Sequence, residues 1–348
     1  MKQVPDRRRA APKAGCSPLG GQRNRRSRGA WGHQSGAALL TAMITVALVA
    51  TLAAGALWRQ WRGVEVEAAE RARVQSAWLL TGALDWSRLI LSGDYSEDER
   101  KRQMVDHLGE PWAVPLAEAR LSTFLAAGES SSDTHRDAFL SGEVTDLQSR
   151  LNVMNLAVGD ANGRQEAYLR FQRLFELLNL RNAELALLRD NLQRAADAMK
   201  AAAPDGNDAP LLPRRFDQLA WLGLSPESLQ VLRPYLTVLP LEGSAATKVN
   251  VNTAPAPVLV AALGLNPADA QRLVGERERD FFKDLADARL QRADTAWAGV
   301  NSSFFEVRGR LRLDDVALEE VSVVRRTGRN RVSTLWRERA ALSVPVAR

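Results

Sequence analysis

The strongest constraint on the fold is an uncharged apolar run at residues 37–57. The run is 21 residues long. A helix rises about 1.5 Å per residue, so this length crosses a hydrocarbon core of about 30 Å. Trp58 and Trp61 follow the run, where tryptophan commonly marks the membrane interface. We therefore expect a membrane-spanning helix over 37–58.

The positive charge of the chain is concentrated before this run. Residues 1–36 hold nine basic residues and one acid, which gives them a net charge of +8. The whole chain carries +6, so the remainder carries −2. Basic residues beside a membrane helix stay on the cytoplasmic side, which places the remainder across the membrane. A slightly acidic remainder argues against a nucleic-acid-binding surface.

The junction Gly36–Ala37 places a glycine ahead of the apolar run, and the only cysteine, Cys16, lies in the leader. A secretory signal peptide has a shorter apolar core and its cleavage site after that core. The order found here resembles the class III signals of type IV pilins and type II secretion pseudopilins. That resemblance implies that prepilin peptidase cuts between Gly36 and Ala37, removes leader 1–36 and methylates the new N-terminus. An ordinary signal-anchor is the alternative.

Beyond the membrane run, the pattern predicts helix, then strands, then helices, then strands. Apolar residues at helical spacing over 59–92 predict an outer, periplasmic half of the same helix, which ends at Gly93. We expect a charged turn at 96–102 and a short edge strand at 112–116. Alternating residues within 139–156 and 303–324 predict strands, and 165–200 reads as one helix. The domains expected are an α+β core over 93–160 and 300–326, an inserted helical domain over 161–299, and a polar, poorly ordered tail over 327–348.

An internal repeat lies within the helical part, where LGLSPESLQVL at 222–232 matches LGLNPADAQRL at 263–273. In each copy Gly ends one helix, Ser or Asn caps the next, and Pro takes its first position. Each copy therefore predicts a pair of helices joined by a tight turn. The phrase NVNTA at 250–254 resembles helix-hairpin-helix modules, some of which bind DNA phosphates through backbone amides. Pro267 removes one such amide, so DNA binding is kept only as the alternative function.

Two longer phrases carry a specific resemblance. DLQSRLNVMNL at 146–156, and LRPYLTVLP at 232–240 followed by KVNVNTA at 248–254, are similar to phrases of the minor pseudopilin K family of type II secretion systems. The resemblance implies an α+β fold, in which a pilin-like long N-terminal helix packs on a small antiparallel sheet. A large all-α domain of SAM-like helix hairpins is inserted into that sheet. The motif residues are Asp146, Asn152, Asn155, Asn250, Asn252 and Thr253.

The same resemblance implies a non-enzymatic subunit at the tip of the pseudopilus. Most pseudopilins have Glu at the fifth mature position, whereas this chain has Thr41, as the K class does. The implied partners are minor pseudopilins of the I and J classes, prepilin peptidase, the inner-membrane secretion platform and secreted substrates. No nucleic acid is expected, and the sequence has neither an HExxH nor a GxSxG motif. A plain signal-anchored scaffold is a third reading.

Calcium is the one cofactor that the family suggests. The family's Asp-rich segment with its tryptophan has no counterpart near residue 190. Asp205, Asn207 and Asp208 offer the hard oxygen ligands that calcium prefers. These three residues are therefore the candidate calcium ligands.

Overall fold

The structure is a computed structural model that describes residues 35–120, 138–201, 208–240, 245–288, 290, 295–313, 316–329 and 331–342. It divides into two units, residues 1–66 and residues 67–348. The leader up to residue 34 lies outside the described residues.

The described part of the first unit is helical and belongs to α1 (Ser35–Lys101). The most apolar window of this helix has a mean hydropathy of 2.2, and none of it is buried. Thr41, Thr45 and Thr51 each donate their hydroxyl to a carbonyl of the preceding turn. These bonds satisfy the hydroxyls inside the helix, as a hydrocarbon environment requires. The long helix with a membrane-spanning composition is thus present as expected.

The predicted end of α1 was wrong. The helix runs through Gly93, and the expected turn at 96–102 is helix as far as Lys101. A glycine inside a helix costs only about 1 kcal/mol, which packing can offset. Leu91 is fully buried, and Arg326 bonds the Leu91 carbonyl and the Asp94 carboxylate. These tertiary contacts hold the last turns, and no local pattern signals them.

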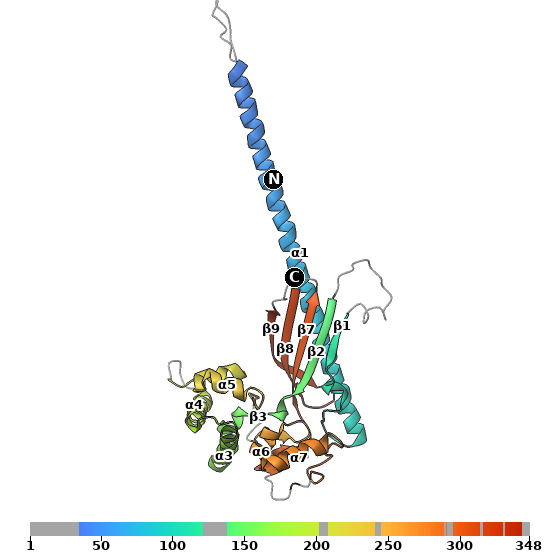
Figure 1. Cartoon of the computed structure of the whole chain (residues 1–348), viewed down its shortest axis with the longest axis vertical. Coiled ribbons are helices and arrows are strands. Elements are labelled where there is room, and N and C mark those ends of the chain that lie inside the picture. Colours follow the sequence, from blue (N-terminus) through green and yellow to red (C-terminus); the bar gives the residue numbers. More distant parts are fainter. Residues whose placement is uncertain are drawn as a thin grey trace, which may run out of the picture. The chain divides into compact units, whose positions relative to one another are not determined.

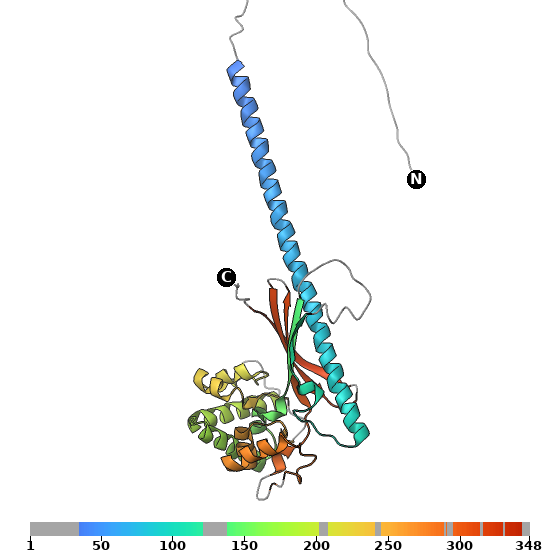
Figure 2. The same ribbon diagram turned by 45° about the vertical axis from the view of Figure 1, so that its right-hand side comes forward.

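In the second unit, a five-stranded antiparallel sheet packs against the later part of α1 (Figures 1 and 2). Its order is β1 (Leu116–Arg120), β2 (Ala138–Asp146), β7 (Phe304–Leu313), β8 (Val316–Arg326) and β9 (Val332–Leu342). From α1, Leu80 packs with Leu311 and Leu318, while Leu84 and Leu91 pack with Phe305 and Val307. The pilin-like α+β fold is confirmed.

Two predictions at the sheet edges were wrong. The tail forms β9, in which Arg337 and Arg339 pair with the fully buried Glu320 of β8. Because of these charges, residues 327–348 were predicted to be a polar, poorly ordered tail. The edge strand expected at 112–116 is displaced, since β1 begins only at Leu116. Trp112 lies instead in the 3₁₀ helix η1 (Pro111–Ala113), with its indole buried edge-on against Phe305 and the ring centroids 5.1 Å apart.

Between β2 and β7 the chain forms the helical insert. Its helices are α3 (Ala161–Leu177), α4 (Asn182–Lys200), α5 (Pro226–Leu232), α6 (Ala256–Leu263) and α7 (Pro267–Arg277). Its 3₁₀ helices are η2 (Leu147–Ser149), η3 (Val153–Ala157), η4 (Phe216–Leu222) and η5 (Thr295–Trp297). The insert also contains two pairs of short parallel strands. They are β3 (Leu151–Asn152) with β4 (Leu236–Thr237), and β5 (Val249–Asn250) with β6 (Ala298–Gly299).

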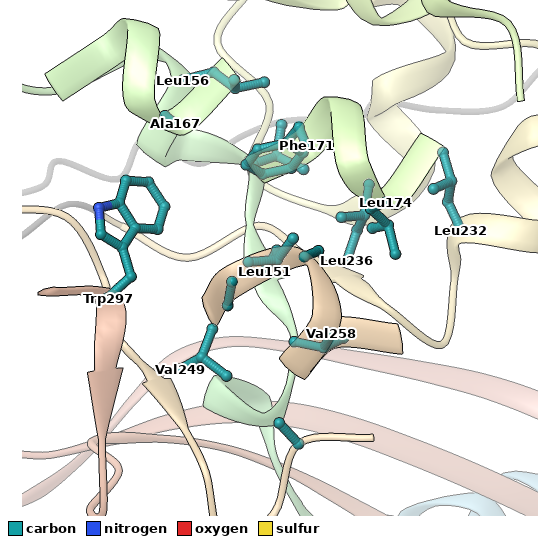
Figure 3. Close-up of a cluster of buried hydrophobic side chains, with 14 of the residues drawn as sticks. Leu151, Leu156, Ala167, Phe171, Leu174, Leu232, Leu236, Val249, Val258 and Trp297 are labelled. Carbon is teal, nitrogen blue, oxygen red and sulfur yellow. The ribbon is translucent and has the colours of Figure 1, made fainter. Parts of the chain in front are cut away.

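One apolar core fills the insert. Leu151, Phe171, Leu174, Val258 and Trp297 meet in it from four different elements, β3, α3, α6 and η5 (Figure 3). Burying side chains of this size contributes roughly 1.5–3 kcal/mol each. The short strands and helices of the insert are stable only together because they share this core.

The turn chemistry of the repeat was predicted correctly. Gly223 and Gly264 have positive φ angles of 107° and 66°, and Ser225 and Asn266 cap the helices that follow them. The first member of the first copy is the 3₁₀ helix η4 rather than an α-helix. The expected single helix at 165–200 is divided at residues 178–181, where Asn179 has a φ of 56°.

The insert also contacts the edge of the sheet. Arg215 donates to Glu338 of β9 at 2.7 Å, and its guanidinium lies 5.4 Å from the centre of the Trp336 ring. These contacts of Arg215 join the insert to β9, in addition to the covalent connections of the insert to β2 and β7.

Replacing Gly142 should destabilise the sheet. A Cβ at this position would lie 2.9 Å from the Arg308 carbonyl oxygen, so β2 and β7 would have to separate. We expect Gly142→Ala to lower the free energy of unfolding by about 2 kcal/mol. The matched control is Gly275→Ala, whose Cβ would meet nothing within 4 Å inside α7. Thermal unfolding of the detergent-purified chain checks both, and equal effects would contradict the prediction.

Candidate functional site

The six motif residues are all buried where the insert meets the sheet. Their relative exposures lie between 0% and 7%. They divide into two hydrogen-bonded groups, one around Asp146 and one around the two asparagines that follow η2. The sequence resemblance identified these residues as a set, whereas their contacts come from the folded chain.

Asp146 ends β2 and is the centre of the first group. Its Oδ1 accepts the backbone N–H of Gln148 at 2.7 Å, which caps η2. Its Oδ2 accepts three side-chain donors, from Thr253 at 2.5 Å, Ser302 at 2.6 Å and Asn250 at 3.1 Å. A carboxylate has enough lone pairs for all four donors, whereas an amide does not.

Asn250 extends this group to the rest of the fold. Its Nδ2 also donates to the Asp106 carbonyl and to the Ser302 hydroxyl, both at 3.0 Å. Its Oδ1 accepts the N–H of Asn252, whose own amide pairs in both directions with the Phe282 backbone at 2.9 Å. The NVNTA turn is therefore held by side-chain amides rather than presented to solvent.

Asn152 and Asn155 form the second group and do not contact Asp146. Asn152 bonds both the N–H and the carbonyl of Leu239, at 3.0 and 3.2 Å. Asn155 does the same with Thr247, at 2.9 and 3.0 Å. Each asparagine bonds both backbone groups of a residue that lies outside the described strands, as a neighbouring strand would, so both roles are architectural.

An ion cluster that sequence reasoning missed lies beside Asp146. Arg326, at the end of β8, has a 2% exposed side chain and pairs with Asp94 of α1 at 2.9 Å and with Asp106. Asp106 Oδ2 accepts the N–H of Ser302 at 2.7 Å. The partners come from α1, the loop after it and the end of the sheet. No spacing in the sequence relates them.

We call Asp94, Asp106, Asp146, Asn250, Thr253, Ser302 and Arg326 the polar joint. It fastens α1, the sheet and the insert to one another through buried charged and polar groups. Removing one partner from such a network leaves the others buried without compensation, which is costly.

Burial shifts the acids of this region towards their protonated forms. It raises the pKa of Asp94 to about 6, against the opposing effect of the Arg326 charge. It raises the pKa of Asp146 to about 6 as well, although hydrogen bonds from Ser302 and Thr253 oppose it. Both are therefore ionised at neutral pH.

Glu110 behaves differently because its ion-pair partner among the described residues is His107, whose Nε2 lies 3.6 Å from Glu110 Oε1. Burial lowers the pKa of His107, so this imidazole is mostly uncharged at neutral pH. Burial, together with the nearby charges of Asp94 and Asp106, raises the pKa of Glu110 to about 8. It is held by the Trp112 indole N–H and by the backbone N–H of His107 at 3.3 Å. At neutral pH the Glu110 carboxyl is therefore protonated.

The arrangement holds segments together and offers no evident chemistry on a substrate. Oxygens of Asp94, Asp106 and Glu110 lie within 4.8 Å of one another, but Arg326 already pairs with the first two, and we assign no metal there. Of the candidate calcium ligands, Asp205 and Asn207 lie outside the described residues. Asp208 is exposed, and its carbonyl accepts a bond from Arg194 at 2.9 Å. The calcium site stays a prediction.

The residues of the expected cleavage site lie at the start of α1. Gly36 and Ala37 are in its first turn, and Ala37 is exposed. Thr41 donates its hydroxyl to the carbonyls of Ala37 and Ala38, at 3.0 and 2.9 Å. These positions belong to the first unit, whereas the residues of the polar joint all belong to the second.

Comparisons with known proteins agree on one family. Models described as type II secretion system (T2SS), protein K match residues 149–241 and 249–307. The chain is 26% identical over 336 residues to the type II secretion system protein K of Pseudomonas aeruginosa, covering 90% of this chain and 95% of that protein. Its fold is similar to a chain in the crystal structure of the GspK–GspI–GspJ complex of enterotoxigenic Escherichia coli. That match has a TM-score of 0.59 and 17% identity, and it covers 78% of this chain and 98% of the other.

Replacing Asp146 with asparagine should weaken the polar joint. The amide would turn an N–H₂ group towards either the Gln148 N–H or the three side-chain donors. We expect Asp146→Asn to lower the free energy of unfolding by about 3 kcal/mol. Asp160→Asn is the control, because Asp160 is an exposed cap of α3 and asparagine caps a helix equally well. Denaturant unfolding measures both variants. An equal loss of unfolding free energy in the two would contradict the role assigned to the polar joint.

Glu110 should make stability depend on pH. The folded chain holds its proton to about pH 8, whereas the carboxyl of an unfolded chain ionises near pH 4.5. Because the native state binds the extra proton, stability falls as pH rises through this interval. We expect Glu110→Gln to be more stable than the parent by about 2 kcal/mol at pH 8, and equal to it near pH 5. The control is the exposed Glu99→Gln, and a pH-independent difference for Glu110→Gln would refute this account.

Proposed function

Because the chain belongs to the protein K family of type II secretion systems, we propose that it is the minor pseudopilin at the tip of the pseudopilus. It is a single-pass membrane protein anchored by the first part of α1. Its globular unit lies in the periplasm, in line with the basic leader on the cytoplasmic side.

Thr41 is the observation that most directly supports the tip position. In a fibre of pseudopilins, a glutamate at the fifth mature position neutralises the terminal amine of a neighbouring subunit inside the apolar core. The Thr41 hydroxyl is instead used on carbonyls of its own helix. The chain therefore offers no charge to a neighbour and suits a position where that pairing is not required.

The insert supports the same position. It forms a folded body with its own core, attached between β2 and β7. Repetition of such a body along a thin fibre would cause clashes, whereas one copy at the end would not. This chain would begin assembly with minor pseudopilins of the I and J classes, on the inner-membrane platform and after cleavage by prepilin peptidase, and it would contact secreted proteins at the tip. The solved relative is itself part of a complex with GspI and GspJ.

This role is structural rather than enzymatic. The family is a component of the secretion apparatus, and the buried polar joint has the character of an architectural network. DNA binding, the alternative considered from the NVNTA phrase, has no support in the comparisons. The asparagines of that phrase are buried and bonded within the fold.

Deletion and processing test the proposal together. A strain lacking this chain should retain its type II substrates in the periplasm, and the wild-type gene should restore secretion. Mass spectrometry of the membrane form should find a methylated N-terminus at Ala37. Gly36→Leu should leave the leader in place and fail to restore secretion, whereas the control Gly32→Ala should be processed normally. Normal secretion without the chain, or a different N-terminus, would contradict the proposal.

A further inference from the structure

The last residue of α7 is a cation that pairs with backbone rather than with an acid. Arg277 donates through Nη1 to the carbonyls of Val251 and Ala254, at 2.7 and 2.5 Å. Basic residues in the last turn of a helix usually bond the carbonyls of that helix. Arg277 instead fastens the NVNTA turn at 250–254. Nη1 has two N–H groups, so these two bonds use both of its donors.

The other edge of this guanidinium has no acceptor among the described residues. The Nε–H of Arg277 is buried without a partner, and both hydrogen bonds of the side chain within the described chain use Nη1. Burial lowers the pKa of Arg277 to about 10, although the charge of Glu278 opposes the shift. The side chain is therefore a partly desolvated cation at neutral pH. A buried N–H without an acceptor is costly, and an anion placed here would remove that cost.

Arg277 lines a cavity of about 300 Å³, which we call the Arg277 cavity. Its other walls come from the loop after α1 and from the segment after α7. The rings of His107 and Phe281 stack there, with centroids 3.8 Å apart and 9° between their planes. Leu108, also in the lining, is 54% exposed. The cavity thus combines one cation with aromatic and apolar surface, and its size suits a group no larger than about one amino acid.

The charges in the lining favour a carboxylate over a phosphate. Glu278, Arg279 and Asp280 also line the cavity and are exposed, so two acids stand near the one buried cation. These acids would repel a dianion, whereas a single guanidinium can neutralise a single negative charge. The Nε and Nη2 edge of arginine matches the two oxygens of a carboxylate.

We propose that the Arg277 cavity binds a carboxylate attached to an aromatic or apolar group. The carboxylate would bond the free edge of Arg277, and the attached group would lie against Leu108 and the rings of His107 and Phe281. The C-terminal residue of a polypeptide has this chemistry, and so does a free aromatic acid. Because the cavity is shared by the loop after α1 and the end of α7, the ligand would strengthen the attachment of the insert. This site is additional to the proposed function and does not depend on it.

Matched small molecules test the binding. The probes are N-acetyl-phenylalanine, its neutral amide and inorganic phosphate, each added to the detergent-purified full-length chain. We expect the acid to bind with a Kd of about 1 mM or below, measured by ligand-observed NMR, and to raise the unfolding temperature. The amide and phosphate should bind at least about tenfold more weakly. Equal binding of the acid and the amide, or no binding of the acid, would overturn the proposal.

Two variants place the probe in the cavity. Arg277→Lys keeps the charge but removes the two-donor edge, and it should weaken binding of the acid about tenfold. Its control is Arg272→Lys on the same helix, because Arg272 is exposed and pairs with Asp269 and Glu276. Leu108→Glu should weaken binding similarly by repelling the carboxylate, whereas Leu211→Glu, at a leucine that is 76% exposed and outside the lining, should not.

The second variant keeps the test decisive if the first loses its fold. Arg277 also holds the NVNTA turn, so thermal unfolding without ligand must show that Arg277→Lys is folded. Leu108 is exposed, so Leu108→Glu decides the matter alone if it is not. Unchanged binding in Leu108→Glu would place the probe elsewhere and refute the site.

A longer probe identifies the source of the carboxylate. If N-acetyl-Ala-Ala-Phe binds at least as well as N-acetyl-phenylalanine, the cavity accepts the end of a polypeptide. If only the single residue binds, the cavity takes a free acid. Either result supports the carboxylate site, provided that the two variants weaken it.

Discussion

The fold depends on one buried cation. Arg326 neutralises Asp94 and Asp106, and so connects the end of the sheet to α1 and to the loop that follows it. Its backbone N–H also bonds the Ser303 carbonyl at 2.7 Å, beside the point where the chain returns from the insert. A buried ion pair is weak evidence for net stability, because desolvating the charges is expensive. What it supplies here is position, since Arg326 satisfies both carboxylates only where the three segments lie together.

Asp146 carries this positioning into the insert. Its carboxylate collects three donors from two distant segments, Asn250 and Thr253 of one turn and Ser302 just before β7. The insert has its own apolar core, which stabilises its fold. That core does not fix the orientation of the insert relative to the sheet. The polar joint sets the orientation of the insert, because directional bonds fix an angle where apolar contacts permit sliding.

The sequence predicted what local patterns encode and missed what only tertiary contact decides. The membrane-spanning run and the caps at Ser225 and Asn266 follow from periodicity and turn chemistry. The continuation of α1 through Gly93 depends on contacts with Arg326, which is more than two hundred residues away. β9 was not predicted because charged residues such as Arg337 and Arg339 are typical of a solvent-exposed tail. In the folded chain both pair with the buried Glu320. The motif residues were identified by resemblance, but Arg326 had no sequence signal at all.

The place where the insert joins the sheet has a mechanical consequence. The chain leaves the sheet after Asp146 and returns at Phe304, and Asp146 pairs with Phe305 in the ladder. Strands β2 and β7 lie inside the sheet, each flanked by a neighbour on both sides. A pull on the insert along the strand axis therefore loads the interstrand hydrogen bonds in shear, where many must break at once, rather than peeling them from an edge. In the position proposed above, at the end of a fibre, a body attached in this way could take force without separating the strands of the sheet that carries it.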